Sequence, residues 1–340
     1  MTQTTVPPGP SREELRARVR DLREGYFLMH TEMIERYGDV VHWKVGLQDH
    51  FLINHPDDIQ DVLVVNHRKF EQGHGHKDLR QIFGVGLTTA EGDVHKRDRK
   101  LMNPFFRHEH IASAFADTMT RYVGEAMERW QDGEVIEVHH EMMELTLRIV
   151  AKSLFDTDFQ SAELSEFGGA LARAWKVWQT PIAAPLAGLD TRDGRDFTDA
   201  IGTMHQIIHR IIDEHRTSGA DRDDILSWLM QVRDDQGEPM SDTWLRDETM
   251  TLLASGHETT ANGLTWTLHL VYENPDVLER MRREVDDVLG GRMATAEDIP
   301  RLPYTQMVLK EGWRLYPPIW GTERRALVDH ELGGYPIPAG

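Results

Sequence analysis

The chain has 340 residues, with 38 basic and 57 acidic side chains, a formal net charge of −19 and no cysteine. So acidic a protein is a poor partner for nucleic acid or for an anionic membrane surface. The lack of cysteine excludes disulfides, cysteine-ligated metal sites and cysteine nucleophiles within this chain. The length allows one large domain or two smaller ones. We find no signal-peptide pattern and no apolar run of about 18 residues, so we expect a cytoplasmic protein without a membrane span.

The first part of the chain predicts a tail, a helix and a hairpin. Three prolines within residues 1–10 indicate a flexible tail, and residues 11–340 are expected to form a single domain. Ser11 is a good N-cap for a helical stretch ending near Tyr37. The alternating runs "DVVHWKVG" and "HFLINH" predict a β-hairpin. "PDDIQDVLVVN" predicts a helix with proline in its first turn, and the glycine-rich segment 72–92 predicts a long loop.

The rest of the chain is predicted to be mostly helical. Breaks are expected near Arg107, Gly133 and Asp156, and within 181–194 and 218–220. Ser241 opens a periodic stretch that ends at Asn274, roughly 50 Å of helix if it is continuous. Further helices are predicted from Pro275 to Gly290 and from Pro303 to Tyr316, followed by strand and turn. The predicted fold class is mainly α with small β-sheets.

The stretch "LLASGHETTANGLTW" interrupts the apolar run of the long helix with polar residues. Ser255 and Thr259 share a face, and the Thr259 hydroxyl can bond to the Ser255 carbonyl, which tends to bend a helix. One interpretation is a helix bent for packing, with Glu258 on a wet face. The other is a small polar site, opened by Gly256, that binds a small polar molecule and relays protons. A zinc-protease helix is excluded because Ala261 stands where the second histidine would be.

Two further patterns carry charge on one helical face. In "LKEGWRLYPP", Glu311 and Arg314 are three residues apart and can pair, as surface ion pairs commonly do. In "GDVHKRDRKLMNPFF", His95 and Arg99 share a face amid further basic residues. That face is either solvated, or a site for ligand carboxylates, or a docking patch for an acidic partner.

A metal site on one helix is an alternative, because the chain has 18 histidines. "MHQIIHRIIDEH" places His205, His209 and Asp213 four residues apart, a spacing that can bind a metal. No second set of ligands supports a di-iron bundle, so we interpret these as exposed helix residues. His74 and His76 in "GHGH" are interpreted as loop residues.

Taken in order, these motifs resemble the cytochrome P450 family of haem-thiolate monooxygenases in its soluble bacterial form. The resemblance covers nearly the whole chain. It implies that Glu258 is the acid and Thr259 the alcohol of the oxygen-activating motif, and that Glu311 and Arg314 belong to a structural network. It also implies contacts between the haem propionates and three residues, which are His95, Arg99 and Arg324.

The resemblance implies haem b as cofactor, with O2 and an apolar small molecule as substrates. Electrons would come from NAD(P)H through a ferredoxin or flavodoxin-type reductase system, for which His95 to Lys100 is the candidate docking patch. Ser255 stands where the family usually has Ala or Gly, so it would narrow the space beside the haem, next to Gly256. The expected substrate-pocket wall comprises Ile82, Phe83, Val85, Leu87, Ala254 and Ile319.

The chain departs from the family pattern in one serious respect. The family's glycine-, arginine- and cysteine-containing loop, whose thiolate ligates iron, is absent from these 340 residues, so no metal ligand is assigned. We therefore expect the chain as it stands to be inactive and poorly soluble or molten. Two alternatives remain open: a truncated, non-catalytic relative that acts as a binding or interaction module, and the His205/His209/Asp213 metalloprotein.

Overall fold

The computed structural model describes residues 6–19, 22–107, 111, 115–159, 161–178, 191–218, 224–234 and 236–340, and these form two compact units. Unit 1 contains Met1–Gln81, Trp175–Phe197 and Gly321–Gly340, and unit 2 contains Ile82–Ala174 and Thr198–Trp320. The breaks predicted within 181–190 and 219–220 lie outside the described residues. The single domain over 11–340 stays a prediction.

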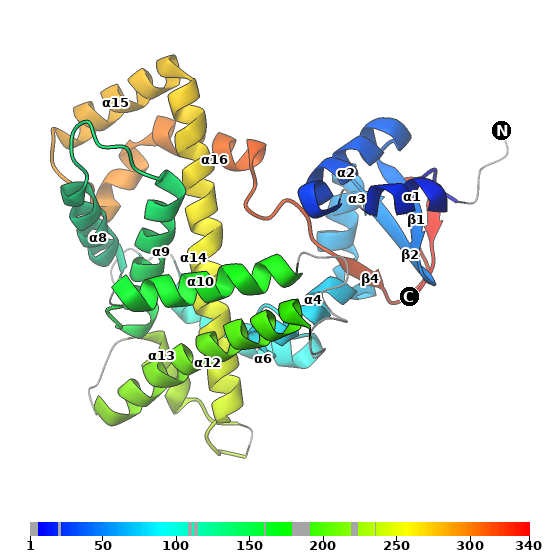
Figure 1. Ribbon diagram of the computed structural model, residues 1–340, viewed down its shortest axis with the longest axis horizontal. Coiled ribbons are helices and arrows are strands. Elements are labelled where there is room, and N and C mark those ends of the chain that lie inside the picture. Colours follow the sequence, from blue (N-terminus) through cyan, green and yellow to red (C-terminus); the bar gives the residue numbers. More distant parts are fainter. Residues whose placement is uncertain are drawn as a thin grey trace. The chain divides into compact units, whose positions relative to one another are not determined.

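Among its described residues, unit 1 holds three two-stranded antiparallel sheets and several helices (Figure 1). β1 (Val40–Val45) pairs with β2 (Gln48–Ile53), β3 (Phe70–Gln72) with β4 (Arg324–Ala326), and β5 (His330–Leu332) with β6 (Tyr335–Ile337). The helices are α1 (Arg12–Val19), α2 (Leu22–Tyr37), α3 (Pro56–Gln60), η1 (Asp61–Val65), η2 (His67–Lys69), α4 (His74–Asp78) and α5 (Arg80–Phe83), which ends just inside unit 2.

The start of unit 1 follows the sequence prediction closely. The Glu14 amide donates to the Ser11 hydroxyl at 3.2 Å, and the Ser11 amide donates to the Glu14 carboxylate at 2.8 Å, which is a reciprocal helix cap. The predicted hairpin is β1–β2. Residues 1–5 of the predicted tail lie outside the described part of the chain. Nearer the helix, the Pro8 carbonyl accepts the His42 amide at 2.9 Å, so this end of the tail lies against β1.

The long loop predicted over 72–92 is wrong in part, because it contains α4 and α5. These helices are only one or two turns long, and such short helices have little stability of their own. Ile82 and Phe83 of α5 are buried, so tertiary packing rather than local propensity accounts for this helix. His74 and His76 accordingly lie on α4 and not in a loop.

Unit 2 consists of helices, the longest of which is α14 (Figure 1). Ser241 caps α14 by accepting the Trp244 amide at 3.1 Å, and the helix runs unbroken from Asp242 to Glu273, as predicted. The helices wholly or mainly in unit 2 are α6 (Gly92–Met102), η3 (Asn103–Phe106), α8 (Ala116–Arg129), α9 (Val138–Phe155), α10 (Ser161–Trp178), α12 (Arg192–Ser218), α13 (Ile225–Gln231), α14 (Asp242–Glu273), α15 (Pro275–Leu289), η5 (Ala296–Arg301) and α16 (Pro303–Leu315). The fold class, mainly α with small sheets, is confirmed.

The helix α9 packs along α14 and fixes which side of α14 is buried. Gly256 lies against Val150 of α9, where a Cβ would come within 2.9 Å of a valine methyl group. The Thr146 hydroxyl of α9 donates to the His257 carbonyl at 3.1 Å. One side of the polar stretch in α14 is therefore committed to helix packing. Within the described residues, no helix is long and apolar enough to cross a membrane.

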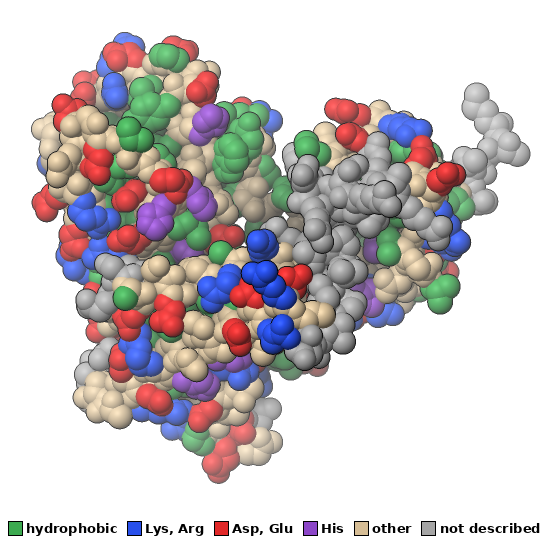
Figure 2. Space-filling model, viewed as in Figure 1, with side chains coloured by type: hydrophobic (Ala, Val, Ile, Leu, Met, Phe, Trp, Pro, Cys, Tyr) green, Lys and Arg blue, Asp and Glu red, His purple; other side chains and the backbone are tan. Residues whose placement is uncertain are grey.

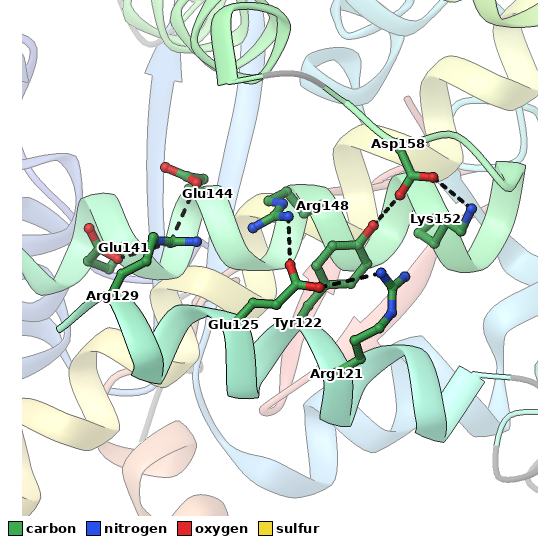
Figure 3. A network of polar contacts seen from close by, with 9 residues as sticks. All are labelled: Arg121, Tyr122, Glu125, Arg129, Glu141, Glu144, Arg148, Lys152 and Asp158. Carbon is green, nitrogen blue, oxygen red and sulfur yellow. Dashed lines mark hydrogen bonds and ion pairs between the residues drawn. The ribbon is translucent and has the colours of Figure 1, made fainter.

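A polar network joins α8, α9 and the segment after α9 (Figure 3). The Tyr122 hydroxyl donates to the Asp158 carboxylate at 2.5 Å, and the Arg121 and Arg148 guanidinium groups lie over the Tyr122 ring at 4.4 and 4.5 Å. The residues of this network are Arg121, Tyr122, Glu125, Arg129, Glu141, Glu144, Arg148, Lys152 and Asp158.

Candidate functional site

The candidate acid and alcohol, Glu258 and Thr259, lie half-buried near the middle of α14. The Thr259 hydroxyl donates to the Ser255 carbonyl at 2.8 Å, as predicted. Four other threonines of α14 make the same bond to the carbonyl four residues back; these are Thr249, Thr260, Thr265 and Thr267. The bond is therefore a property of the helix, and it leaves the Thr259 oxygen lone pairs available as acceptors.

Ser255 brings a second hydroxyl to the same face of α14, one turn before Thr259. It is exposed, and its Oγ lies 3.5 Å from the Oγ1 of Thr88 in the segment before α6. The structure thus brings together Ser255, Thr259 and Thr88. Each of these hydroxyl groups can donate and accept hydrogen bonds, so together they can bind water or another small polar molecule.

His257 faces the opposite way, into the contact with α9. Its residue is 1% exposed, and burial lowers the pKa of the imidazole to about 4. A backbone hydrogen bond with Met143 opposes that shift only in part. The imidazole is neutral at pH 7 and serves as a packing group, so the motif "SGHETT" divides into a buried histidine and an acid–alcohol pair on another face.

The residues expected to form the pocket wall differ in their burial. Ile82, Phe83 and Ala254 are buried, whereas Val85 and Ile319 are exposed. Two of its members, Val85 and Leu87, are bound to α14 through their backbone amides.

Their acceptors, Asp247 and Glu248, were missed by sequence reasoning. Leu87 N–H donates to the Glu248 carboxylate at 2.9 Å, and Val85 N–H donates to that of Asp247 at 2.8 Å. A signal was present, because Trp244, Glu248 and Thr251 are spaced four and three residues apart on one face, which places an acid on an otherwise buried stripe.

The helix α6 carries the predicted propionate contacts His95 and Arg99 one turn apart. Their neighbours are paired: Lys96 Nζ lies 2.9 Å from Asp93, and Arg97 Nε donates to Asp98 at 2.8 Å. Across the described part of the chain, neither His95 nor Arg99 has a carboxylate partner. They remain available for the carboxylates of a ligand.

Arg324, the third predicted propionate contact, lies on β4 in unit 1, whereas His95 and Arg99 lie in unit 2. Its Nη1 donates to the Thr322 hydroxyl at 2.9 Å and to the Glu323 carbonyl at 2.7 Å. Partial burial lowers the pKa of Arg324, although a guanidinium stays charged at neutral pH. No carboxylate among the described residues neutralises it.

Glu311 and Arg314 pair on α16, as predicted from their spacing. The Arg314 Nε and Nη2 atoms donate to the two Glu311 oxygens at 2.7 and 2.6 Å, and these hydrogen bonds lower the pKa of Glu311. Both side chains are more than half exposed. The same helix packs on α14 through close approaches at Gly263 and Gly312.

The metal-site alternative gains no support. Among the residues that the structure describes, no group of three or more His, Asp or Glu side chains lies close enough to hold a metal ion. His205 is partly buried, which lowers the pKa of its imidazole, and Asp213 lies 3.9 Å from Arg216.

The donor groups of unit 2 suit the carboxylates at the edge of a haem. Within unit 2, the side chains of His95 and Arg99 have no acid partner among the described residues and can bind carboxylates, and the hydroxyl-bearing face of α14 can bind a small polar ligand. A thiolate is not among the side chains of this chain.

Comparison with known proteins gives consistent matches. The cytochrome P450 family model matches residues 7–340. Cyclooctatin synthase of Streptomyces melanosporofaciens is 38% identical over 318 residues, covering 92% of this chain and 69% of the relative. Cyclooctat-9-en-7-ol 5-monooxygenase of the same organism is 33% identical with the same coverage. Pentalenene oxygenase of Streptomyces avermitilis is 31% identical, covering 90% of this chain and 69% of the relative.

Proposed function

The chain belongs to the cytochrome P450 family, and from this premise we propose that the complete protein is a haem-dependent monooxygenase acting on an apolar small molecule. The observation that carries the proposal within the molecule is the face of α14 that bears the exposed Ser255 and the half-buried Glu258 and Thr259, with Thr88 near the Ser255 hydroxyl. The opposite side of the same motif is buried against α9.

Each proposed site residue has a role that follows from its chemistry. The chemistry supplied by a bound haem is the reductive activation of dioxygen. His95 and Arg99 of α6 would hold its propionates by charge-assisted hydrogen bonds, a role that we also propose for Arg324 of unit 1. The Thr259 hydroxyl donates to the Ser255 carbonyl, so its lone pairs accept from a proton-bearing water or ligand. Glu258 then delivers protons to the water or ligand bound at the Thr259 hydroxyl, acting as a general acid.

The remaining roles concern architecture. The Ser255 hydroxyl takes space that Ala or Gly would leave open, while Gly256 sets the distance between α14 and α9. The Glu311–Arg314 pair stiffens α16. Because the two side chains bind each other, we assign them to structure and not to chemistry.

We infer the substrate class from the relatives and the pocket wall. The names of two relatives state action on cyclooctat-9-en-7-ol and on pentalenene. The wall proposed here, from Ile82 to Leu87 with Ala254 and Ile319, is apolar. We therefore propose a substrate of comparable kind for this chain, with electrons delivered by a ferredoxin or flavodoxin-type partner in the cytoplasm and drawn from NAD(P)H.

The first test of the proposal concerns the thiolate ligand of the iron, because no residue of this chain has a thiol. The first step is to read the codons that follow Gly340 in the coding region. A loop with Phe, Gly, Arg and Cys supports the monooxygenase, and the protein that includes it is the one to assay. A stop codon directly after Gly340 favours the non-catalytic binding module instead.

The assay itself compares neighbouring threonines of α14. With pentalenene and cyclooctat-9-en-7-ol as probes and a ferredoxin system as donor, Glu258→Gln should lower product formation on the order of 100-fold. Thr259→Val should divert electrons to peroxide. Thr260→Val is the matched control, since Thr260 makes the same helix bond at 3.0 Å. Equal coupling in the two threonine variants would refute the assignment of Thr259.

A further inference from the structure

Three buried acids of unit 2 lie around the segment that precedes α6. Glu248 and Asp98 are both 0% exposed, and Asp247 is also buried. Glu248 and Asp247 belong to α14 and Asp98 belongs to α6. Buried carboxylates are rare unless they are paired or hydrogen-bonded, so this cluster requires a physical account.

The acids hold the backbone of the segment Gly84–Thr89, which we call the wall loop. Asp247 accepts the Val85 amide at 2.8 Å and Glu248 accepts the Leu87 amide at 2.9 Å. The Thr89 hydroxyl closes the wall loop by donating to the Gly84 carbonyl at 2.6 Å. The wall loop is therefore bonded to α14 at Val85 and Leu87, and its two ends, Gly84 and Thr89, are bonded to each other.

Two glycines allow this close approach. A Cβ on Gly84 would overlap the Asp247 carboxyl group, and one on Gly86 would overlap the Thr251 hydroxyl. Gly84 also has a φ of +67°, which side-chain-bearing residues rarely adopt. The backbone of the wall loop therefore lies directly on the acids and hydroxyls of α14.

The charges of the cluster are only partly balanced by cations. Arg246 donates to Asp247 Oδ1 at 2.6 Å, and Arg97 donates to Asp98 Oδ1 at 2.8 Å. The other oxygens, Glu248 Oε1 and Asp98 Oδ2, are buried and have no hydrogen-bond partner within the described structure. The two side chains themselves are neighbours, close enough for a hydrogen bond when one of them carries a proton.

Two neighbouring carboxyl groups satisfy both of these oxygens when one proton lies between them. Burial, followed by the charges of Asp98 and Asp247, raises the pKa of Glu248 to about 8, while the Leu87 amide opposes the shift. The geometry and the charge balance thus agree on a protonated acid at neutral pH.

We propose that Glu248 and Asp98 share one proton and that this pair, with Asp247, is a positioning device that clamps the wall loop onto α14. Only the identification of this loop as part of the substrate pocket rests on the proposed function. The clamp sets where Val85 and Leu87 stand, and it holds Thr88 beside Ser255 on the face of α14 that carries Thr259.

Loss of the shared proton loosens the clamp. Above about pH 8 Glu248 and Asp98 are both anionic inside the protein, and they repel each other. The charged groups that face the pair are Arg97 on α6 and Arg246 and Asp247 on α14, with His205 of α12 near the latter two. Burial lowers the pKa of His205, so its imidazole is neutral around pH 8.

Amide hydrogen exchange on the complete protein, measured without haem and without an activity assay, tests the clamp. Exchange at Val85 and Leu87 is followed from pH 6 to 9.5 and divided by the intrinsic chemical rate. We expect protection at Leu87 to fall about tenfold or more between pH 7 and 9, whereas Glu248→Gln, which keeps an acceptor oxygen and donates to Asp98, stays protected. Asp93→Asn, at an exposed acid of α6, should behave as the unmodified chain.

Protection at Leu87 that does not depend on pH, or an equal loss of protection in Glu248→Gln, would overturn the proposal. An infrared difference spectrum at pH 7 provides a second test. The unmodified chain should show the carbonyl band of a protonated carboxylic acid, and Glu248→Gln and Asp98→Asn should each lack it. Persistence of that band in both variants would equally reject the shared proton. Because both readouts are independent of haem, failure of the monooxygenase proposal would leave them unaffected.

Discussion

At the scale of single residues, neighbouring side chains of "SGHETT" have separate environments. His257 is buried against α9, whereas Ser255 is exposed and Glu258 and Thr259 are half-buried. Successive residues of an α-helix point about 100° apart, so a motif of adjacent letters is divided among faces. This explains how one short stretch both packs the helix and presents an acid and an alcohol.

His257 makes stability dependent on pH in the acid range. Its folded pKa of about 4 lies below the unfolded value of 6.5, so between these values the unfolded chain binds a proton that the folded chain does not. Its contribution is present above pH 6.5 and is lost as the pH falls toward 4. In urea unfolding, the stability lost between pH 7 and pH 4.5 should be smaller for His257→Gln by on the order of 2 kcal/mol. Identical pH profiles for the two proteins would contradict this prediction.

At the scale of helices, close approaches at glycine fix how α16 packs on α14. A Cβ on Gly312 would lie 2.5 Å from the Thr267 hydroxyl, and one on Gly263 would lie 2.6 Å from Trp313. Trp266 of α14 also stacks on Tyr316, which follows α16, with ring centroids 4.4 Å apart. The two glycines therefore allow α14 and α16 to approach closely, and the stacked rings of Trp266 and Tyr316 cover part of the contact between the helices.

Gly312→Ala should destabilise unit 2 by about 1–3 kcal/mol, because the added methyl group overpacks the joint between α14 and α16. The matched control is Gly202→Ala on α12, where nothing lies within 4 Å of the added carbon. That change should stabilise its helix by up to about 1 kcal/mol, since alanine has the higher helix propensity. The measurement is the midpoint of thermal unfolding of both variants. Equal midpoints for Gly312→Ala and Gly202→Ala would contradict the packing argument.

Tyr122→Phe tests the polar network between α8 and the segment after α9. The variant loses the hydrogen bond to the Asp158 carboxylate but keeps a ring under Arg121 and Arg148. We expect a loss of about 1–2 kcal/mol in unfolding free energy, typical of a bond to a charged group. Tyr272→Phe, at a site that is 65% exposed, should change stability by less than about 0.5 kcal/mol. Similar losses in the two variants would refute a specific role for the network.

At the scale of the whole molecule, apolar side chains reach the surface of unit 2 around α15 and α16 (Figure 2). Exposed aromatic and aliphatic residues there include Trp266, Met307, Trp313, Leu315, Tyr316, Ile319 and Trp320. Exposed apolar patches commonly mark an interaction surface or an aggregation risk. The poor solubility of the 340-residue chain by itself stays a prediction.

The absence of a thiol leads to a spectroscopic prediction. When the 340-residue chain is titrated with haem, reduced and exposed to carbon monoxide, it should show no thiolate-type Soret band, because no side chain supplies a thiolate. Absorption spectra with and without the chain give the measurement. A thiolate-type band would overturn the prediction.

The proposed docking patch also belongs to the whole molecule, because it is a basic surface on an acidic protein. In the complete protein, charge reversal at Lys96 and Lys100 should slow electron transfer from a ferredoxin and reduce its dependence on salt. Reversal at the exposed Arg283 of α15, which pairs with Glu279, is the control. Rates and salt dependence that stay unchanged in the Lys96 and Lys100 variant would place the patch elsewhere.

The sequence by itself determined the long helices, the first hairpin and the family. The Ser11 and Ser241 caps, the length of α14, the β1–β2 pairing and the Glu311–Arg314 pair all follow from local rules of spacing and capping. The motif order sufficed for the family, which the comparisons confirm. These features are local, so a linear pattern encodes them.

Only the tertiary structure decided the short helices of 74–83 and the role of Asp247, Glu248 and Asp98. Burial stabilises a helix as short as α5, and no propensity reports burial. The three acids come from α14 and α6, some 150 residues apart, and they meet the wall loop only after folding. Their state of protonation depends on desolvation and on neighbouring charge, which are properties of the folded interior and not of the sequence pattern.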